Sequence, residues 1–268
     1  MMKQRIITMT TDFGLKDPYV GAMKGVILSI NPIARMIDIS HQVPPGGVQT
    51  AARVLMETHP FFPPQTIHLA VIDPGVGGPR RPIIVCARDH LFVGPDNGLF
   101  WPIISQDPAV EVIHLTKATY FRPIVSHTFH GRDIFAPVAA HLSSGVNPRQ
   151  MGNRINDPVR LGMDRPHQTE STLAGKITTI DRFGNLITNI RQATLTEFLG
   201  GHHPVIRLGE WVTTELHNQY TDVTPGTLLA LFSSSGYLEI AVNQGRAADA
   251  FKENEAALQG KEVVVEKR

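Results

Sequence analysis

Apolar residues in roughly the first 150 positions follow two alternating patterns. Short β-branched runs predict strands, and longer segments with apolar residues at helical spacing predict helices. The predicted strands cover residues 5–10, 35–39, 67–72 and 110–114. The predicted helices cover residues 19–30, 48–58 and 133–142. Residues 83–86 and 90–93 predict a hairpin around Ala87-Arg88-Asp89. Strands that alternate with helices indicate an α/β domain, with a central sheet flanked by helices.

The pattern changes in the second part of the chain. Residues 147–172 are rich in Asn, Pro, Arg, Asp and Gln and lose their apolar periodicity, which predicts a linker. Beyond it, short runs separated by turn residues predict strands at 175–181, 186–190, 205–208, 228–232, 237–242 and 262–265. Only residues 194–198 predict a helix there. We therefore expect an N-terminal α/β domain over residues 1–165, linker included, and a small antiparallel β domain over 166–268.

Composition narrows the class of protein. The 268 residues carry 25 Lys and Arg against 24 Asp and Glu, so the net charge of +1 predicts no nucleic-acid partner. The single cysteine, Cys86, excludes a disulfide framework and a cysteine-based zinc cluster. Eighteen consecutive apolar residues occur nowhere, and the first residues lack a secretion signal. These features predict a cytoplasmic protein with no membrane partner.

The first candidate site segment follows the first predicted strand. Asp12 lies directly after that strand, and Asp17 precedes the first predicted helix. Ligands of open α/β sheets bind at the carboxyl ends of the strands, which makes both carboxylates candidates for ligand binding. The alternative is structural, with Asp12 capping a turn and Asp17 serving as the helix N-cap. Position alone leaves both interpretations open.

The second candidate segment is the glycine-rich loop from Asp73 to Arg81. It also follows an apolar strand, so Asp73 is expected at the same edge of the sheet as Asp12. The glycines do not form a G-x-G-x-x-G or Walker motif, which argues against a nucleotide phosphate site. Arg80, seven residues after Asp73, is expected to fold back on it and keep it ionised. A purely structural Asp–Arg clamp remains the alternative.

The third candidate segment contains His127 and His130 and opens the last helix of the first domain. Two histidines three residues apart can hold a metal, but no further carboxylate–His pair occurs at ligand spacing. The sequence therefore predicts no metal site. His130 remains a candidate for catalysis, with a structural histidine as the alternative.

In the second domain, residues 181–185 place an aromatic ring beside an amide. Phe183 offers a flat face, and Asn185 offers both a donor and an acceptor, which together suit an adenine-like heterocycle. The alternative is a hairpin turn with a buried Phe183. Two other segments, 95–98 (PDNG) and 233–236 (SSSG), are typical turn sequences that could also form functional loops.

Taken together, the candidate segments form a pattern that is more specific for a protein family than any single segment. They run in the order TDFG, DPYVGAMKG, DISH, AARVL, DPGVG, GPDNGL, TFHGRDIFAP, DRFGNLITNI and SSGYLEIAVN over residues 11–243. In this respect the chain resembles the S-adenosyl-L-methionine (SAM) hydroxide adenosyltransferases, or SAM hydrolases, which are relatives of the SAM-dependent fluorinase and chlorinase. The resemblance implies a two-domain fold with a β-barrel-like C-terminal domain. It also implies a homotrimer with active sites between subunits.

The resemblance implies a role for each candidate residue. Asp73, Arg80 and His130 match the set that holds and polarises the attacking water, and Asp12 matches the carboxylate that grips the ribose hydroxyls. Asp17 and Asp181 match contacts to the methionine part, whereas Phe183 and Asn185 match the adenine-binding pair. The loop and strand that close over methionine and adenine contribute Ser234, Glu239 and Val242. SAM is then the substrate, with no cofactor, and adenosine and L-methionine are the products.

The chain departs from the halogenases at four positions. They carry a tyrosine at the position of Asp73, a halide-holding serine at Gly131, a tryptophan near Gly46 and a carboxylate-binding arginine at Ser235. A carboxylate at position 73 repels halide but can accept a hydrogen bond from water, which favours hydrolysis. A halogenase, a non-catalytic SAM or adenosine binding module, and an enzyme for another adenosyl or nucleoside substrate remain the alternatives.

Overall fold

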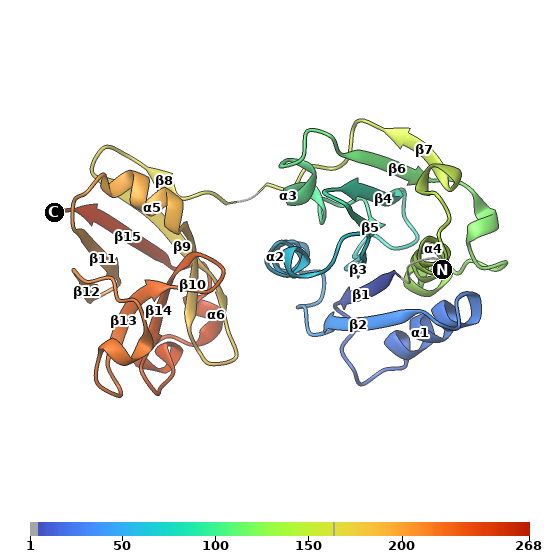
Figure 1. Ribbon diagram of the computed structural model, residues 1–268. Helices are drawn as coiled ribbons and strands as arrows, with labels where there is room; N and C mark the ends of the chain where they lie inside the picture. The colour runs from blue at the N-terminus through green and yellow to red at the C-terminus, as the bar shows by residue number, and fades with distance from the viewer. Residues whose placement is uncertain (1–4, 163) are drawn as a thin grey trace. The chain divides into compact units, whose positions relative to one another are not determined.

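The computed structural model describes residues 5–162 and 164–268 and divides the chain into two compact units (Figure 1). The first unit is Met1–Met163 and the second is Asp164–Arg268. The boundary expected from the sequence, between residues 165 and 166, lies two residues after this division. Each unit has its own sheet and its own buried core.

The first unit is built on a seven-stranded sheet in the order β2-β1-β3-β5-β4-β6-β7. Strands β1, β2, β3 and β5 pair in parallel, and β4, β6 and β7 pair antiparallel with their neighbours. The strands are β1 (Ile6–Thr11), β2 (Arg35–Ser40), β3 (Ile67–Val71), β4 (Pro82–Ala87), β5 (His90–Pro95), β6 (Glu111–Leu115) and β7 (Gly152–Ile155). The expected hairpin forms between β4 and β5, where Arg88 and Asp89 both have positive φ angles as a tight two-residue turn requires.

Helices cover both faces of this sheet. The helices are α1 (Tyr19–Ile30), α2 (Val48–Thr58), α3 (Trp101–Ile104) and α4 (Ala136–Ser143). Successive residues of β4 point to opposite faces, so Ile84 packs in the cluster that contains α1 and α4, while Ile83 and Val85 pack in the cluster that contains α2 and α3. This two-sided burial explains why the central strands read as continuous apolar runs.

The second unit contains an eight-stranded antiparallel sheet that curls into a barrel-like shape. Its main path runs β12-β11-β15-β9-β10-β14-β13, with β8 paired to β9. The strands are β8 (His167–Gln168), β9 (Thr172–Ile180), β10 (Leu186–Arg191), β11 (Pro204–Leu208), β12 (Trp211–Thr213), β13 (Leu228–Phe232), β14 (Tyr237–Val242) and β15 (Glu262–Lys267). Two helices, α5 (Gln192–Leu199) and α6 (Glu255–Leu258), contribute Leu195, Phe198 and Leu258 to its core. The expected fold class, α/β followed by antiparallel β, is confirmed.

Three features of the elements differ from what the sequence predicts. Part of the segment expected to be a linker forms β7, which pairs with β6, and β8 pairs with β9. The short elements α3, α6 and β12 were not expected, because elements of three or four residues are too brief to show a period. The last helix of the first unit begins with a π-helical turn, Gly131–Phe135 (η3), before α4. Among the described helices, none combines the length and the apolar character needed to cross a membrane.

Candidate active site

The candidate site lies at the carboxyl edge of the parallel strands in the first unit. Strands β1 and β3 are parallel neighbours, and Thr11 pairs with Val71 at their ends. Asp12 follows Thr11 directly, and Asp73 follows Val71 by two residues, so both leave the sheet at the same edge. This placement confirms the strand-end position that the sequence predicts for the two carboxylates.

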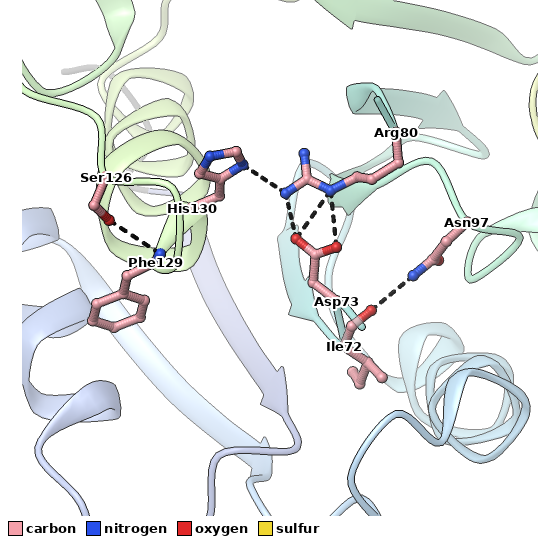
Figure 2. A network of polar contacts seen from close by, with 7 residues as sticks. All are labelled: Ile72, Asp73, Arg80, Asn97, Ser126, Phe129 and His130. Atoms are coloured by element: carbon pink, nitrogen blue, oxygen red, sulfur yellow. Dashed lines mark hydrogen bonds and ion pairs between the residues drawn. The ribbon is translucent and has the colours of Figure 1, made fainter. Parts of the chain in front are cut away.

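Asp73 and Arg80 form a buried ion pair across the glycine-rich loop (Figure 2). Arg80 Nε donates to both carboxylate oxygens of Asp73, at 2.8 and 3.0 Å, and Arg80 Nη2 donates to Asp73 Oδ2. The two side chains are only 10% and 5% exposed. The arginine therefore folds back on the carboxylate as expected, and low exposure strengthens the pair relative to one at the surface.

His130 joins this pair through Arg80, as Figure 2 shows. Arg80 Nη2 lies 2.7 Å from His130 Nδ1. Because a guanidinium has only donors, Nδ1 must be the acceptor, and the neutral imidazole then carries its proton on Nε2. Burial, and next the charge of Arg80, lower the pKa of His130 below its usual value. The geometry thus fixes both the charge and the tautomer of the ring.

Packing around Arg80 holds the three side chains together. The Arg80 guanidinium lies over the ring of Phe135, 5.4 Å from the ring centroid, and Phe135 is fully buried. Gly77, with a φ of +77°, brings the glycine-rich loop very close to the segment that contains His127. A Cβ at position 77 would lie 2.3 Å from the carbonyl oxygen of His127. The loop that contains Asp73 and Arg80 therefore packs directly against the segment that contains His130.

Asp12 contacts a neighbouring loop and does not cap its own turn. Its Oδ2 accepts a hydrogen bond of 2.8 Å from the backbone N–H of Gly46. Asp17 is exposed, and helix α1 has Pro18 at its N-cap with no side-chain cap, so the N-cap interpretation of Asp17 was wrong. Both carboxylates remain candidates for ligand contacts.

Three aromatic residues form a cluster that includes Phe129, the residue directly before His130 in the chain. Phe13, Tyr19 and Phe129 pack with ring centroids 5.2 to 5.9 Å apart. They help to line a cleft of about 390 Å³ within the first unit, together with Ser126, Thr128 and Arg132. The sequence interpretation did not single out this cluster, because its members come from two stretches far apart in the chain and carry no shared pattern.

In the second unit, Asp181 organises the turn that presents Phe183. Asp181 Oδ1 accepts hydrogen bonds from the backbone N–H groups of Phe183 and Asn185, and Oδ2 accepts one from the Asn185 side chain at 3.0 Å. Phe183 is 73% exposed, so the alternative of a buried Phe183 was wrong. An exposed ring on a tightly bonded turn is a suitable stacking platform for a flat heterocycle.

The remaining candidates of the second unit lie along β14. Ser234 is exposed at the tip of the β13–β14 hairpin, and Val242 ends β14 at the opposite end, near the turn of Phe183. Glu239 lies between them, 3% exposed, and accepts a hydrogen bond of 2.8 Å from the Tyr220 hydroxyl. Burial raises the pKa of Glu239. Six strand residues span about 20 Å, so Ser234 and Phe183 do not meet at one point.

Some supporting residues were missed by the sequence interpretation. The Asn97 side chain donates to the carbonyl of Ile72 at 2.8 Å, which fixes the backbone directly before Asp73 (Figure 2). Ser126 Oγ accepts from the backbone N–H of Phe129 at 3.1 Å, next to His130. The PDNG segment, which contains Asn97, indicated a possible functional loop, although it was interpreted mainly as a turn.

Comparison with known proteins identifies the family. Residues 7–152 match the family model described as the SAM hydroxide adenosyltransferase N-terminal domain, and residues 175–257 match that of the C-terminal domain. The chain belongs to the SAM hydroxide adenosyltransferase family. A relative from Salinispora tropica, named (R)-S-adenosyl-L-methionine hydrolase, is 39% identical over 91% of this chain and 92% of its own length.

Two further matches are a solved structure and a relative of lower identity. A crystal structure of an uncharacterised conserved protein from Thermotoga maritima has a TM-score of 0.88 and 36% identity, covering 98% of this chain and all of the other. A protein named fluorinase, from an Actinoplanes species, is 26% identical and covers 89% of this chain and 91% of its own length. The identity of this chain to the fluorinase is lower than its identity to the SAM hydrolase.

Proposed function

We propose that this protein hydrolyses SAM to adenosine and L-methionine, by attack of water on the ribose C5′. The observation that carries the proposal is the buried network of Asp73, Arg80 and His130 at the carboxyl edge of the sheet. The family membership and the relatives named as SAM hydrolases support the same reaction.

The chemistry of the substrate limits what the protein has to supply. A sulfonium leaves as a neutral thioether, so the departing sulfur needs no proton. Water forms the new C5′–O bond as the C5′–S bond breaks, and one proton is released. The remaining requirement is to hold the water in line behind C5′, which is a task of position.

The network suits that task through its fixed hydrogen-bond directions. His130 Nδ1 already accepts from Arg80, so the ring acts as a donor through Nε2–H and orients the water oxygen. The Asp73 carboxylate keeps lone pairs that Arg80 does not use, and it accepts a hydrogen bond from an O–H of the water. Asp73 is thus the proposed proton acceptor, and His130 the proposed orienting donor.

The substrate-binding roles proposed for the other residues follow the resemblance. Asp12 binds the ribose hydroxyls, Asp17 and Asp181 contact the methionine part, and Phe183 with Asn185 binds adenine. Ser234, Glu239 and Val242 complete the methionine and adenine contacts. The exposure of Phe183 supports its stacking role. SAM is the substrate in this scheme, and no cofactor takes part.

We also propose that the protein works as a homotrimer in the cytoplasm, with the turn of Phe183 serving the network of a neighbouring subunit. Light scattering combined with an activity assay tests the assembly. A trimer that loses activity when diluted to monomers is expected. A monomer that hydrolyses SAM at the full rate would contradict the proposal.

The proposed activity is tested by incubating the purified protein with SAM and following the products by chromatography. Adenosine and methionine should appear in equal amounts. Full recovery of SAM despite tight binding would instead indicate a binding module. Added chloride or fluoride should give no 5′-halo-adenosine, because the Asp73 carboxylate repels an anion and Gly131 has no hydroxyl to hold one. Halogenated product would assign the chain to the halogenase type.

A further inference from the structure

The strongest unassigned feature near the site is the carboxylate of Asp133. It is fully buried, three residues after His130 in the π-helical turn Gly131–Phe135. Arg132 Nε and Nη2 donate to its two oxygens at 2.7 and 2.9 Å, and Arg122 Nη1 lies 3.5 Å from Oδ1. Burial alone would raise the pKa of Asp133, but hydrogen bonds from Arg132 and Ser126 outweigh it and hold the pKa at about 2.

Asp133 also fastens the backbone that leads to His130. Its Oδ2 accepts the backbone N–H of Ser126 at 3.0 Å, and Ser126 Oγ in turn accepts the backbone N–H of Phe129 at 3.1 Å. The backbone N–H of Asp133 donates to the Phe129 carbonyl, and the backbone carbonyl of Asp133 accepts from the Arg122 N–H. Both ends of the segment from Arg122 to Phe129 are thus hydrogen-bonded to Asp133.

From these contacts we infer that Asp133 is a positioning residue for His130. It holds the segment so that the imidazole Nδ1 meets Arg80 at 2.7 Å, which keeps the ring neutral with its proton on Nε2. Asp133 acts through His130 and does not touch the reacting atoms. The inference rests on the proposed function, because it assigns Asp133 a part in setting the direction of the His130 donor.

The physical reason is the steep dependence of such networks on distance. A misplacement of about 1 Å can reduce turnover about 100-fold when reacting groups must be aligned. π-helical turns are uncommon and often occur at functional sites. Here the turn begins directly after His130, and it contains Asp133, whose side chain accepts from Arg132 and from the Ser126 N–H.

The test compares Asp133→Asn with wild type in two readouts. We expect kcat to fall about 10- to 100-fold, while KM for SAM changes little. In ¹⁵N NMR spectra the His130 ring should change from one fixed tautomer to a mixture. In a His130→Ala background, Asp133→Asn should cost no further activity, because the two residues act through one donor. The matched control is Glu111→Gln, another carboxylate of the first unit that accepts two hydrogen bonds from an arginine, Arg149, but contacts neither the glycine-rich loop nor the segment of His130.

Each outcome decides a separate point. An unchanged tautomer or an unchanged kcat in folded Asp133→Asn would overturn the inference, as would an equal kcat loss in Glu111→Gln. If Asp133→Asn does not fold, Ser126→Ala removes the bond to the Phe129 N–H and the side-chain hydrogen bond to Asp133 but leaves the Asp133 carboxylate in place. The same tautomer change with a smaller loss of kcat is then expected. If wild type shows no SAM hydrolysis, the proposed function fails, and the NMR readout still tests the positioning of His130.

Discussion

At the scale of single residues, the protonation of His130 controls the network. Its Nδ1 can accept from Arg80 only while the ring is neutral, and burial and the Arg80 charge lower its pKa. The neutral ring therefore persists as the pH falls through about 6.5, the ordinary value for histidine. Only below the lowered pKa does protonation remove the acceptor and place a second cation beside Arg80.

The pH dependence of kcat tests this description. The acid limb should lie below pH 6.5 in wild type, and the NMR titration of His130 should give the same midpoint. Arg80→Gln removes the second-largest cause of the lowered pKa, so the His130 midpoint should move upward. A midpoint at or above 6.5 in wild type would contradict the assignment.

Asp73 and His130 should act as one unit. Asp73→Asn and His130→Ala should each reduce kcat by about 10²- to 10⁴-fold, the scale for loss of a positioned acid–base group. The double variant should lose much less than the product of the two effects, because one water serves both residues. SAM affinity, measured by calorimetry, should change little. Effects that multiply cleanly would mean that the residues have independent roles.

Asp12 should affect both binding and turnover. Asp12→Ala removes a charged acceptor for the ribose hydroxyls and the bond to the Gly46 N–H, so we expect a higher KM and a lower kcat. If Asp12 only joins the two loops, unfolding free energy should fall by about 1 kcal/mol while the kinetics stay near wild type. A thermal melt measured beside the rate assay separates these results.

At the scale of elements, the glycine-rich loop depends on its contact with the segment of His130. Gly77→Ala would place a Cβ 2.3 Å from the His127 carbonyl oxygen, at a φ of +77°. We expect a loss of about 1 to 3 kcal/mol of stability together with reduced kcat, because Arg80 shifts with the loop. Gly200→Ala is the matched control, since its φ is +55° but no atom lies within 4 Å of the added Cβ. It should lower stability without lowering kcat; equal kinetics in both variants would contradict the account.

The elements also show where sequence patterns suffice. Helix α1 and helix α2 have the bounds that apolar spacing predicts, because each covers three turns with one face on the sheet. Strand β7 was missed because it is an edge strand of four residues with no fully buried position, so it carries no apolar run. The π-helical turn was missed because a single extra residue does not disturb a 3.6-residue pattern enough to be seen.

At the scale of the whole molecule, the two-unit organisation was predicted from the change of period along the chain. The pairing of Asp73 with Arg80 was predicted from their spacing across the glycines. The contact of Arg80 with His130 could not be derived from residue patterns alone, because the two are 50 positions apart and meet through packing on Gly77 and Phe135. Only the family resemblance grouped the three residues in advance.

The central claim is that water attacks C5′ of SAM, and isotope labelling tests it most directly. Turnover in H₂¹⁸O, followed by mass spectrometry, should place ¹⁸O in the 5′-hydroxyl of adenosine and leave methionine unlabelled. Bond formation at C5′ requires this result, because the new oxygen stays on the ribose. Unlabelled adenosine, or label in the methionine-derived product, would contradict the account.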